Sequence, residues 1–561
     1  MKKFLAILLT ILMLLPMFST MAFAGTTVTP DKNADPGTPA YEAWLESEEY
    51  EAIDTYEELK AAIIDDPAGK YYLTGDITEN ERDKQFVNTF SGIWDGNGYT
   101  VYNWTNYIAE TITGQVRNIT FSKFTDSSEN TEIKAVDWSV LGKIAGDGSV
   151  FENIINYREI ANSVSNYYGV LIREASGDVS FINCKNYGSM KQSGGLNRKC
   201  GGFVGTMNGG TMTFKNCENH GSIQASQVGG FIGTINATAT IKFENCINSG
   251  KITGIAASED AYGSSGGFIG CTNNATRGDA LAYDVTIEFK NCHNYGDVLR
   301  KDYDSNTRTS RQGGFAGYLY LGDNNKLTLS FDDCTVEDCT ISGKGSNNTT
   351  QWGEAAGLVG KIKAKNAGTS ITVKNCTESN VTIDANEGKF AFVRVQTPDI
   401  VTLENCVANN VVDGTGAEVA ITQKDGDGTS VLKFTEESSI VSINKAQQSA
   451  IVDDASNVRF IGTVDGLAYV EIGYYIEYNG KTIKKTNNVV YKSLSDNFGV
   501  DSITAESLGA KYLTSIVMTD LPTSASGTIN VTPYVKKADG TYIYGKTKGI
   551  EINSGEIGEC L

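Results

Sequence analysis

Between residues 181 and 406 the apolar and polar positions follow one phrase, in which an apolar residue, a spacer and Asn-Cys recur. Four copies continue into Asn-x-Gly, at Phe181–Gly188, Phe214–Gly221, Phe243–Gly250 and Phe289–Gly296. Self-similarity at an interval of roughly thirty residues is typical of solenoids, in which each unit buries its apolar face on the next. The pattern therefore predicts a stack of short strands.

A second phrase precedes the first in each unit and consists of two small residues, an apolar pair and a glycine. Its copies are Gly201–Gly205, Gly229–Gly233, Gly266–Gly270, Gly313–Gly317 and the drifted Ala356–Gly360. Short apolar strands bounded by glycine suit the coils of a parallel β-helix. Glycine permits the bends between faces, where a Cβ atom would clash.

Asn at one place in successive coils predicts a ladder of amide hydrogen bonds at the strand spacing of about 4.8 Å. The predicted ladder positions are Asn183, Cys184, Asn216, Cys217, Asn245, Cys246, Asn291, Cys292, Cys334, Asn375, Cys376, Asn405 and Cys406. Longer intervals between these positions contain inserts, such as Ala257–Ser265 and Arg300–Arg311. We expect these inserts to emerge as loops on one side.

The cysteine slot accepts other apolar residues, because Phe151–Asn156 matches the phrase with Ile154 in place of cysteine. Seven of the eleven cysteines occupy this slot, which indicates reduced, buried thiols that act as small hydrophobes. Disulfides between adjacent coils are the alternative, because stacked Cα atoms lie near 5 Å apart. Cys200 and Cys271 flank the glycine phrase. Cys560 is either exposed and reactive or without a role.

The two phrases together resemble the GLUG-type repeats of secreted bacterial proteins, mainly from Gram-positive anaerobes. The segment Tyr71–Asn103 is similar to the usual start of such repeats, and the resemblance covers roughly residues 70 to 410. It implies adhesin-like or surface-associated proteins and no single biochemical activity.

The two ends of the repeat region differ from it in pattern. Tyr56–Ile64 is amphipathic and follows Thr55, so it predicts a capping helix with Thr55 as its N-cap. Alternating strands from Val458 to Ile552, with hairpin signals at Asn479-Gly480 and Asp539-Gly540, predict an immunoglobulin-like β-sandwich. This last part also resembles a C-terminal module that is common in exported clostridial proteins.

The fold class expected is therefore all-β: a right-handed parallel β-helix with an N-terminal cap, followed by the sandwich. Lys2 and Lys3, an apolar stretch and Ala22–Ala24 form a secretory signal peptide. The predicted divisions are a signal peptide (1–24), a linker (25–48), the capped β-helix (49–435), a second linker (436–456), the sandwich (457–555) and a tail (556–561).

A net charge of −20 disfavours nucleic acid as a partner. No later segment is long and apolar enough to predict a membrane span. With only two histidines, His220 and His293, both at variable repeat positions, we expect neither a metal nor another cofactor. The expected location is extracellular, either released or held non-covalently at the cell surface.

Parallel β-helices also support polysaccharide lyases and hydrolases, which need convergent carboxylates or a basic residue beside a Ca²⁺ site. The weak catalytic candidates are Asp332 and Asp333, although neighbouring strand residues point to opposite faces. Asp302, Asp304, Arg308 and Arg311 either border a groove or form an ordinary charged loop. Asp95–Gly98 reads as a turn rather than a calcium loop.

The sequence thus favours a non-catalytic, adhesin-like protein that presents its β-helix to a glycan or to a cell-surface protein. A carbohydrate-active enzyme and a purely structural spacer remain as alternatives.

Overall fold

The structure is a computed structural model that describes most of the chain between residues 28 and 558. Residues outside the description are 1–27, 80–84, 123–138, 161–166, 192–197, 257–262, 273–282, 303–309, 345–352, 387, 396–400, 405, 418, 420–430, 434–440, 450–453, 465–470, 488–489, 495–501, 538–541 and 559–561. The predicted signal peptide, Asn405, Asp539-Gly540 and Cys560 lie outside the described residues.

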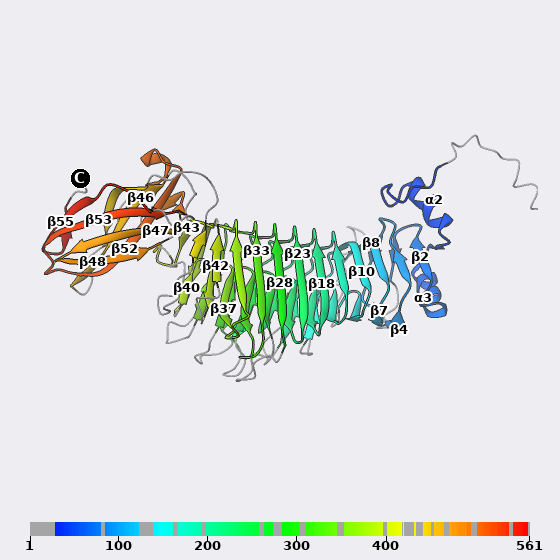
Figure 1. Cartoon of the computed structure of the whole chain (residues 1–561). Helices are drawn as coiled ribbons and strands as arrows, with labels where there is room; N and C mark the ends of the chain where they lie inside the picture. Colours follow the sequence, from blue (N-terminus) through cyan, green and yellow to red (C-terminus); the bar gives the residue numbers. More distant parts are fainter. Residues whose placement is uncertain are drawn as a thin grey trace, which may run out of the picture.

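The described chain is nearly all β, and long parallel sheets run along its central part (Figure 1). The first column of the largest sheet begins before the recognised repeats and continues through them. Its strands are β1 (Glu51–Ile53), β2 (Lys70–Leu73), β5 (Ile93–Asp95), β8 (Gln115–Ser122), β10 (Ser149–Asn156), β13 (Val179–Ile182), β18 (Gly210–Lys215), β23 (Ala239–Glu244), β28 (Val285–Lys290), β33 (Leu327–Asp332), β38 (Ser370–Lys374), β42 (Val401–Glu404) and β44 (Val431–Lys433).

Two further columns of this sheet follow the first along the coils, and the third begins only with β15. The second contains β3 (Ile77–Thr78), β6 (Thr100–Tyr102), β14 (Lys185–Asn186), β19 (Glu218–Asn219), β24 (Ile247–Asn248), β29 (His293–Asn294), β34 (Thr335–Glu337), β39 (Thr377–Asp384) and β43 (Val407–Val412). The third contains β15 (Met190–Lys191), β20 (Ile223–Ala225), β25 (Ile252–Ala256), β30 (Val298–Asp302) and β35 (Thr340–Ser342).

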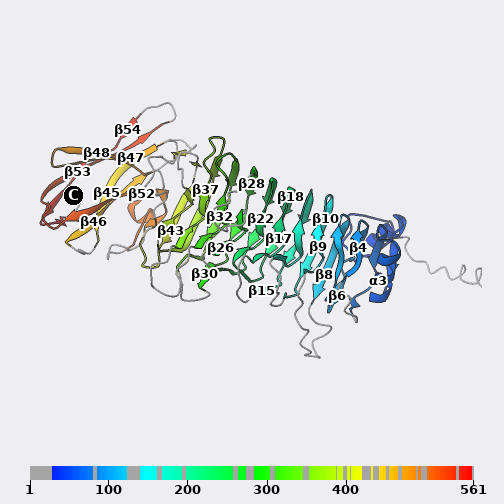
Figure 2. The same ribbon diagram turned by 90° about the horizontal axis from the view of Figure 1, so that it is seen from below.

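Two smaller parallel sheets complete the coils (Figure 2). One contains β11 (Tyr167–Gly169), β16 (Lys199–Gly201), β21 (Gln227–Gly229), β26 (Gly263–Gly266), β31 (Ser310–Gly313), β36 (Gly353–Ala356) and β40 (Gly388–Phe390). The other contains β4 (Gln85–Phe90), β7 (Tyr107–Ile112), β9 (Gly142–Ala145), β12 (Ile172–Ala175), β17 (Val204–Met207), β22 (Ile232–Ile235), β27 (Ile269–Thr272), β32 (Ala316–Tyr320), β37 (Val359–Lys363) and β41 (Val393–Val395).

Equivalent residues of successive repeats pair directly. Phe181 pairs with Phe214, which pairs with Phe243, and the glycine phrases pair in the same way through Gly201 and Gly229. One repeat therefore makes one coil, as in a parallel β-helix. The prediction of a β-rich chain with long parallel sheets is confirmed.

Phenylalanines from the two phrases form the centre of the core. Rings from the first phrase stack along the axis, as Phe214 and Phe243 do at 4.9 Å between centroids, and those from the glycine phrase stack at 4.7 Å for Phe203 and Phe231. The two columns meet edge to face, at 79° between Phe214 and Phe231. Each phrase thus contributes one ring to a continuous aromatic core.

The helices α2 and α3 lie at the N-terminal end of the stack (Figure 1). The predicted helix is confirmed as α3 (Tyr56–Asp65), and Thr55 Oγ1 accepts a hydrogen bond from the Glu58 amide at 3.2 Å. Its Leu59 and Ile63 are buried in the main core. The prediction of a linker over 25–48 is wrong for α2 (Pro39–Ser47), which buries Tyr41 and Leu45 against Tyr72.

The C-terminal part contains two antiparallel sheets that share a core. One contains β45 (Val441–Gln448), β46 (Ala455–Val464), β52 (Tyr512–Pro522) and β49 (Val490–Tyr491), and the other contains β48 (Lys481–Thr486), β47 (Glu471–Tyr478), β53 (Gly527–Lys536), β55 (Lys548–Asn553) and β56 (Glu556–Ile557), with β54 (Tyr542–Tyr544) beside β53. A small sheet pairs β50 (Ser493–Leu494) with β51 (Ile503–Thr504), and a 3-10 helix follows at Glu506–Leu508. Phe460 on β46 and Ile529 on β53 belong to the same buried cluster.

The boundary between the two regions differs from the prediction. The supposed linker at 436–456 contains β45, which pairs with β46 along its length because its apolar residues complete the shared core. In addition, β43 of the last coil pairs with β49 through Val407 and Val490. The C-terminal sheet that contains β45, β46, β49 and β52 therefore continues the largest sheet, whereas the sheet that contains β47, β48 and β53 is separate from it.

The predicted hairpin at Asn479-Gly480 is confirmed between β47 and β48, and both turn residues have positive φ, 49° and 72°. Over the part of the chain that the structure describes, no helix has the length and apolar character needed to cross a membrane.

Candidate functional site

The first asparagine of each phrase forms an exposed ladder on the outside of the stack. Asn183 has φ of 53°, and its Nδ2 donates to Asn153 Oδ1 of the preceding coil at 2.9 Å. Asn216, Asn245 and Asn291 repeat this bond at 2.9 Å. Asparagine tolerates the left-handed conformation better than most residues. The same residue therefore makes the turn through its backbone and the ladder through its side-chain amide.

The second asparagine of each phrase forms another ladder, which is buried and which the sequence interpretation missed. Asn186 donates through Nδ2 to Asn219 Oδ1 at 2.9 Å and to Gly188 O at 3.1 Å. Its Oδ1 accepts from Asn156 Nδ2 at 2.9 Å and from the Gly188 amide at 3.1 Å. All four hydrogen-bonding positions of this amide are used. The signal was present in the sequence as the invariant Asn of Asn-x-Gly.

The glycine phrase lies directly against the buried ladder. A Cβ atom at Gly202 would lie 2.5 Å from Asn219 Oδ1 and 2.1 Å from Gly230 O, and Gly230 stands in the same relation to Asn248. These contacts are too short for any side chain. The two phrases are therefore two halves of one packing arrangement.

The cysteine slot is buried in every described coil. Cys184, Cys217, Cys246, Cys292, Cys334, Cys376 and Cys406 are all free thiols with no exposed surface. Cys184 Sγ lies 3.3 Å from Phe151 O of the preceding coil, and Cys217 Sγ lies 3.4 Å from Phe181 O. In the same slot, Ile154 pairs with Ile119 and both are buried. Burial raises the pKa of the Cys200 thiol to about 12 and that of Cys271 to about 11.

Asp332 and Asp333 do not converge on a common groove. Asp333 takes the left-handed position of the exposed ladder, with φ of 56°. Asp332 Oδ1 accepts from Asn375 Nδ2 at 3.0 Å. A carboxylate has no proton to donate to the preceding coil. Asp333 therefore interrupts the exposed ladder in the coil that follows Asn291.

The charged insert predicted at 300–311 is partly strand. Arg311 belongs to β31 and is nearly buried, with its Nε 3.0 Å from Glu354 Oε2. Lys361 Nζ lies 2.9 Å from Glu354 Oε1. Asp302 ends β30, because β25 and β30 pair as far as Ala256 and Asp302, whereas Asp304 and Arg308 lie outside the described residues. Residues 263–265 of the other predicted insert likewise belong to β26.

The two histidines lie on the outside of the second column. His220 stacks on Tyr187 at 4.6 Å and 8°, and Tyr187 stacks on Tyr157 at 4.9 Å. His220 Nε2 contacts Glu218 Oε2 at 2.7 Å. His293 stacks on Tyr295 at 5.9 Å. Both imidazole rings thus stack on tyrosine rings on the outside of the coils.

Asp95 ends β5, just before the turn at Asn97 and Gly98, and its carboxylate is satisfied by protein atoms. Its carboxylate contacts Arg117 Nε at 2.7 Å and the Tyr41 hydroxyl at 2.8 Å. Asn97 and Gly98 have positive φ, as the turn interpretation requires. Among the described residues, His, Cys, Asp and Glu form no group of three or more suited to hold a metal ion.

The last coils have a different second turn, which the sequence interpretation also missed. Asp338, Asn380 and Asn410 have φ of 50°, 55° and 53°, and Asn380 Nδ2 donates to Asp338 Oδ1 at 2.9 Å. Asn294, the last residue of the buried ladder, donates to Cys339 Sγ at 3.7 Å.

In these coils the buried slot is occupied by Val336 and Glu378, in register with Asn294. Glu378 has no exposed surface, and among the described residues its carboxylate oxygens have no hydrogen-bond partner. Burial raises the pKa of Glu378 well above its ordinary range. It is the one buried acid in a slot that is otherwise amide or apolar in the coils from Asn156 to Ala408.

Comparison with known proteins yields no matching family model, no matching curated protein and no matching solved structure.

Proposed function

We propose that this protein is a non-catalytic, adhesin-like extracellular protein whose stack of coils carries binding surfaces for glycans or for cell-surface partners. The observation that carries this proposal is that the repeated polar residues bond to one another. The amides of Asn183 and Asn186 serve neighbouring coils, and Asp332 accepts from Asn375. Such residues build a rigid rod, and functional contacts are left to the exposed side chains.

The finer description of the fold belongs to the same proposal. The stack is a right-handed β-helix of GLUG-type repeats, and α3 caps its first coil. The burial of Leu59 and Ile63 in the main core supports the cap, because an uncovered end would expose apolar side chains and strand edges. The C-terminal module is an immunoglobulin-like sandwich, which is supported by two antiparallel sheets around one core.

The protein is exported by its signal peptide and is then released or held non-covalently at the surface. The basic start, apolar stretch and Ala22–Ala24 support this location. Free thiols fit an oxidising location only if they are inaccessible, and the ten described cysteines are buried.

A glycan array probed with the intact, signal-free protein tests the proposal. We expect retention on a restricted set of glycans, with no release of soluble products from acidic polysaccharides, with or without Ca²⁺. Product release that is abolished by Asp333→Ala would instead establish the enzyme alternative. Absence of binding to every glycan and to cell surfaces would favour a structural spacer.

A further inference from the structure

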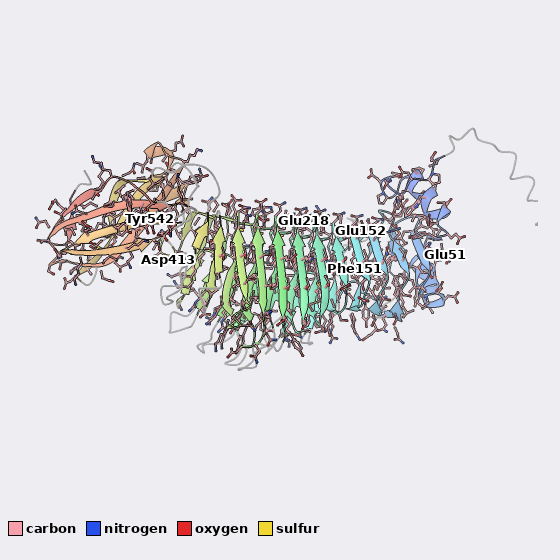
Figure 3. The ribbon with its side chains drawn as sticks, viewed as in Figure 1. Glu51, Phe151, Glu152, Glu218, Asp413 and Tyr542 are labelled. Atoms are coloured by element: carbon pink, nitrogen blue, oxygen red, sulfur yellow. The ribbon has the colours of Figure 1, made fainter. Side chains whose placement is uncertain are left out.

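The outer face of the first column is regular along the central coils, where β18, β23, β28 and β33 lie side by side (Figure 1). Side chains on these strands alternate between the core and the outside. At the upstream end Phe151 is buried, whereas its neighbour Glu152 lies on the outer face of β10 (Figure 3). The outward side chains form three rows along the stack: Thr211, Thr240, Thr286, Thr328 and Ser370; Thr213, Lys242, Glu288, Ser330 and Thr372; and Lys215, Glu244, Lys290, Asp332 and Lys374.

The third of these rows changes sign at every coil. Lys215 pairs in register with Glu244, and Glu244 with Lys290. Lys290 pairs with Asp332, and Asp332 with Lys374. All five side chains are exposed or partly exposed. We call these five residues the alternating row.

Contacts within one molecule leave the charges of this face accessible. Lys215 Nζ lies 3.7 Å from Glu244 Oε2, and the two side chains are 48 % and 44 % exposed. In the next row, Lys242 Nζ lies 3.8 Å from Glu288 Oε2, and these side chains are exposed to the same degree. Exposed pairs at such distances contribute little to the stability of a fold. A charged group from outside can therefore still bind them.

The alternating row is complementary to itself in reverse order. A two-fold axis parallel to the strands, placed between two copies and midway between the coils of Lys290 and Asp332, turns the row onto itself. Lys290 then faces the second copy's Asp332, and Glu244 faces its Lys374. Every contact between the two copies of the row joins opposite charges.

The neighbouring rows accept the same arrangement. Glu288 faces the second copy's Ser330, and Lys242 faces its Thr372, so no like charges oppose each other. The remaining row brings together only threonine and serine side chains. Sheets that pack face to face lie about 10 Å apart, a distance that a lysine and a facing carboxylate bridge.

The size of the face fits a weak, reversible contact. The strands β18, β23, β28 and β33 each have six residues. Six coils at about 4.8 Å and six residues at about 3.3 Å give about 570 Å² for each copy. The total of about 1,100 Å² is at the low end of specific protein interfaces.

We propose that the outer face of the first column binds a second copy of this chain, with the two stacks antiparallel and the alternating rows opposed. The partner is a second copy because reversal of the row supplies the opposite charge at every position. The inference goes beyond the proposed function and does not depend on it.

Sedimentation velocity of the intact, signal-free protein over a concentration series tests the proposal. We expect a concentration-dependent dimer that NaCl weakens, because the contacts join exposed charges. Lys290→Glu and Asp332→Lys should each weaken self-association about tenfold, since each creates two like-charge contacts across the axis. Lys485→Glu, an equal change at an exposed position of β48, is the matched control and leaves self-association unchanged.

A mixture of the two variants gives the sharpest result. The substituted position 290 of one chain then faces the substituted position 332 of the other, and the unchanged Asp332 faces the unchanged Lys290. Both contacts again join opposite charges. We expect the mixture to form a dimer of about wild-type affinity, although each variant alone associates poorly.

A wild-type protein that stays monomeric at about 0.1 mM would overturn the proposal. So would a dimer that neither variant weakens, because it would use another surface. A mixture that associates no better than its components would exclude the antiparallel register. Circular dichroism checks that each variant retains its fold, and the glycan array decides the proposed function separately.

Discussion

The central coils and the last coils use the same first turn but make the second turn differently. In the central coils Asn-x-Gly directs an amide inward, as in Asn294, and Val298 follows Asn294 by four positions. In the next coil Val336 and Ile341 pair with these two positions and are five residues apart. The added residue allows the left-handed turn at Asp338.

This difference shows that the coils can fill the buried position beside the second turn in two ways. In the central coils an asparagine occupies it and hydrogen-bonds to the next asparagine and to the backbone, whereas in the later coils apolar residues such as Val336 and Ala408 occupy it. Glu378 fits neither arrangement, because it is polar, buried and without a ladder partner among the described residues. The last coils should therefore be the less stable part of the stack.

The largest effect is expected from Asn186→Ala. The substitution leaves Gly188 N and O, Asn156 Nδ2 and Asn219 Oδ1 without a bond that they now make. Buried groups without partners cost about 1–3 kcal/mol each, so we expect a loss of about 3–5 kcal/mol in the free energy of unfolding. Chemical denaturation followed by circular dichroism measures it.

Asn183→Ala in the same coil is the matched control. It removes an exposed amide and places alanine in a left-handed turn, which costs about 1–2 kcal/mol. Equal losses for the two variants would show that the buried ladder has no special role in stability.

A smaller, pH-dependent effect is expected from Glu378→Gln. Because the folded-state pKa of Glu378 is raised, the folded protein binds its proton more tightly than the unfolded chain does. The free energy of unfolding is then greatest below the unfolded pKa of about 4.3 and falls as the pH rises towards the folded pKa, by at most about 1.4 kcal/mol per unit. The variant should remove this slope and stabilise the last coils at neutral pH.

The measurement is denaturation at several pH values, together with hydrogen exchange of β39 and β43. Glu288→Gln, which changes a half-exposed carboxylate on β28, serves as the control and should preserve the slope. An unchanged slope in Glu378→Gln would contradict the assignment.

The smallest effect concerns the thiols and changes reactivity rather than stability. The buried thiols, with the pKa of Cys339 raised by burial to about 12, should resist a thiol-specific reagent at pH 8. We expect labelling of at most Cys560 in the native protein and of all eleven cysteines after denaturation. Rapid labelling of Cys184 or Cys217, identified by peptide mass, would contradict a closed stack.

Much of the fold could be predicted because the repeat makes one local pattern recur in every coil. The comparison of Ile154 with the cysteines identified a buried apolar slot, and Thr55 marked the start of α3. The helix α2 was missed because only its packing of Leu45 on Tyr72 distinguishes it from a polar linker. Strand β45 was missed because the sequence between it and its partner β46, residues 449–454, contains no clear hairpin signal.

Candidate sites were less predictable, because they depend on which residues a coil brings together. Arg311 and Glu354 are 43 residues apart in sequence and meet only through the pairing of β31 with β36. Tyr475, Tyr534 and Tyr544 similarly share one face of a sheet only because β53 pairs with β47 and β54.

The sequence by itself determined that equivalent residues stack, since a repeated pattern of apolar residues, asparagine and glycine leaves one register that buries the phenylalanines of the repeats, such as Phe214 and Phe243. The tertiary structure alone decided which asparagine faces inward, where the second turn changes, and which tyrosines remain exposed. The physical reason is that periodicity specifies contacts between like residues of adjacent coils. Contacts between unlike residues, such as Gly202 with Asn219 and Tyr534 with Gly473, depend on how the chain turns within a coil or a sheet.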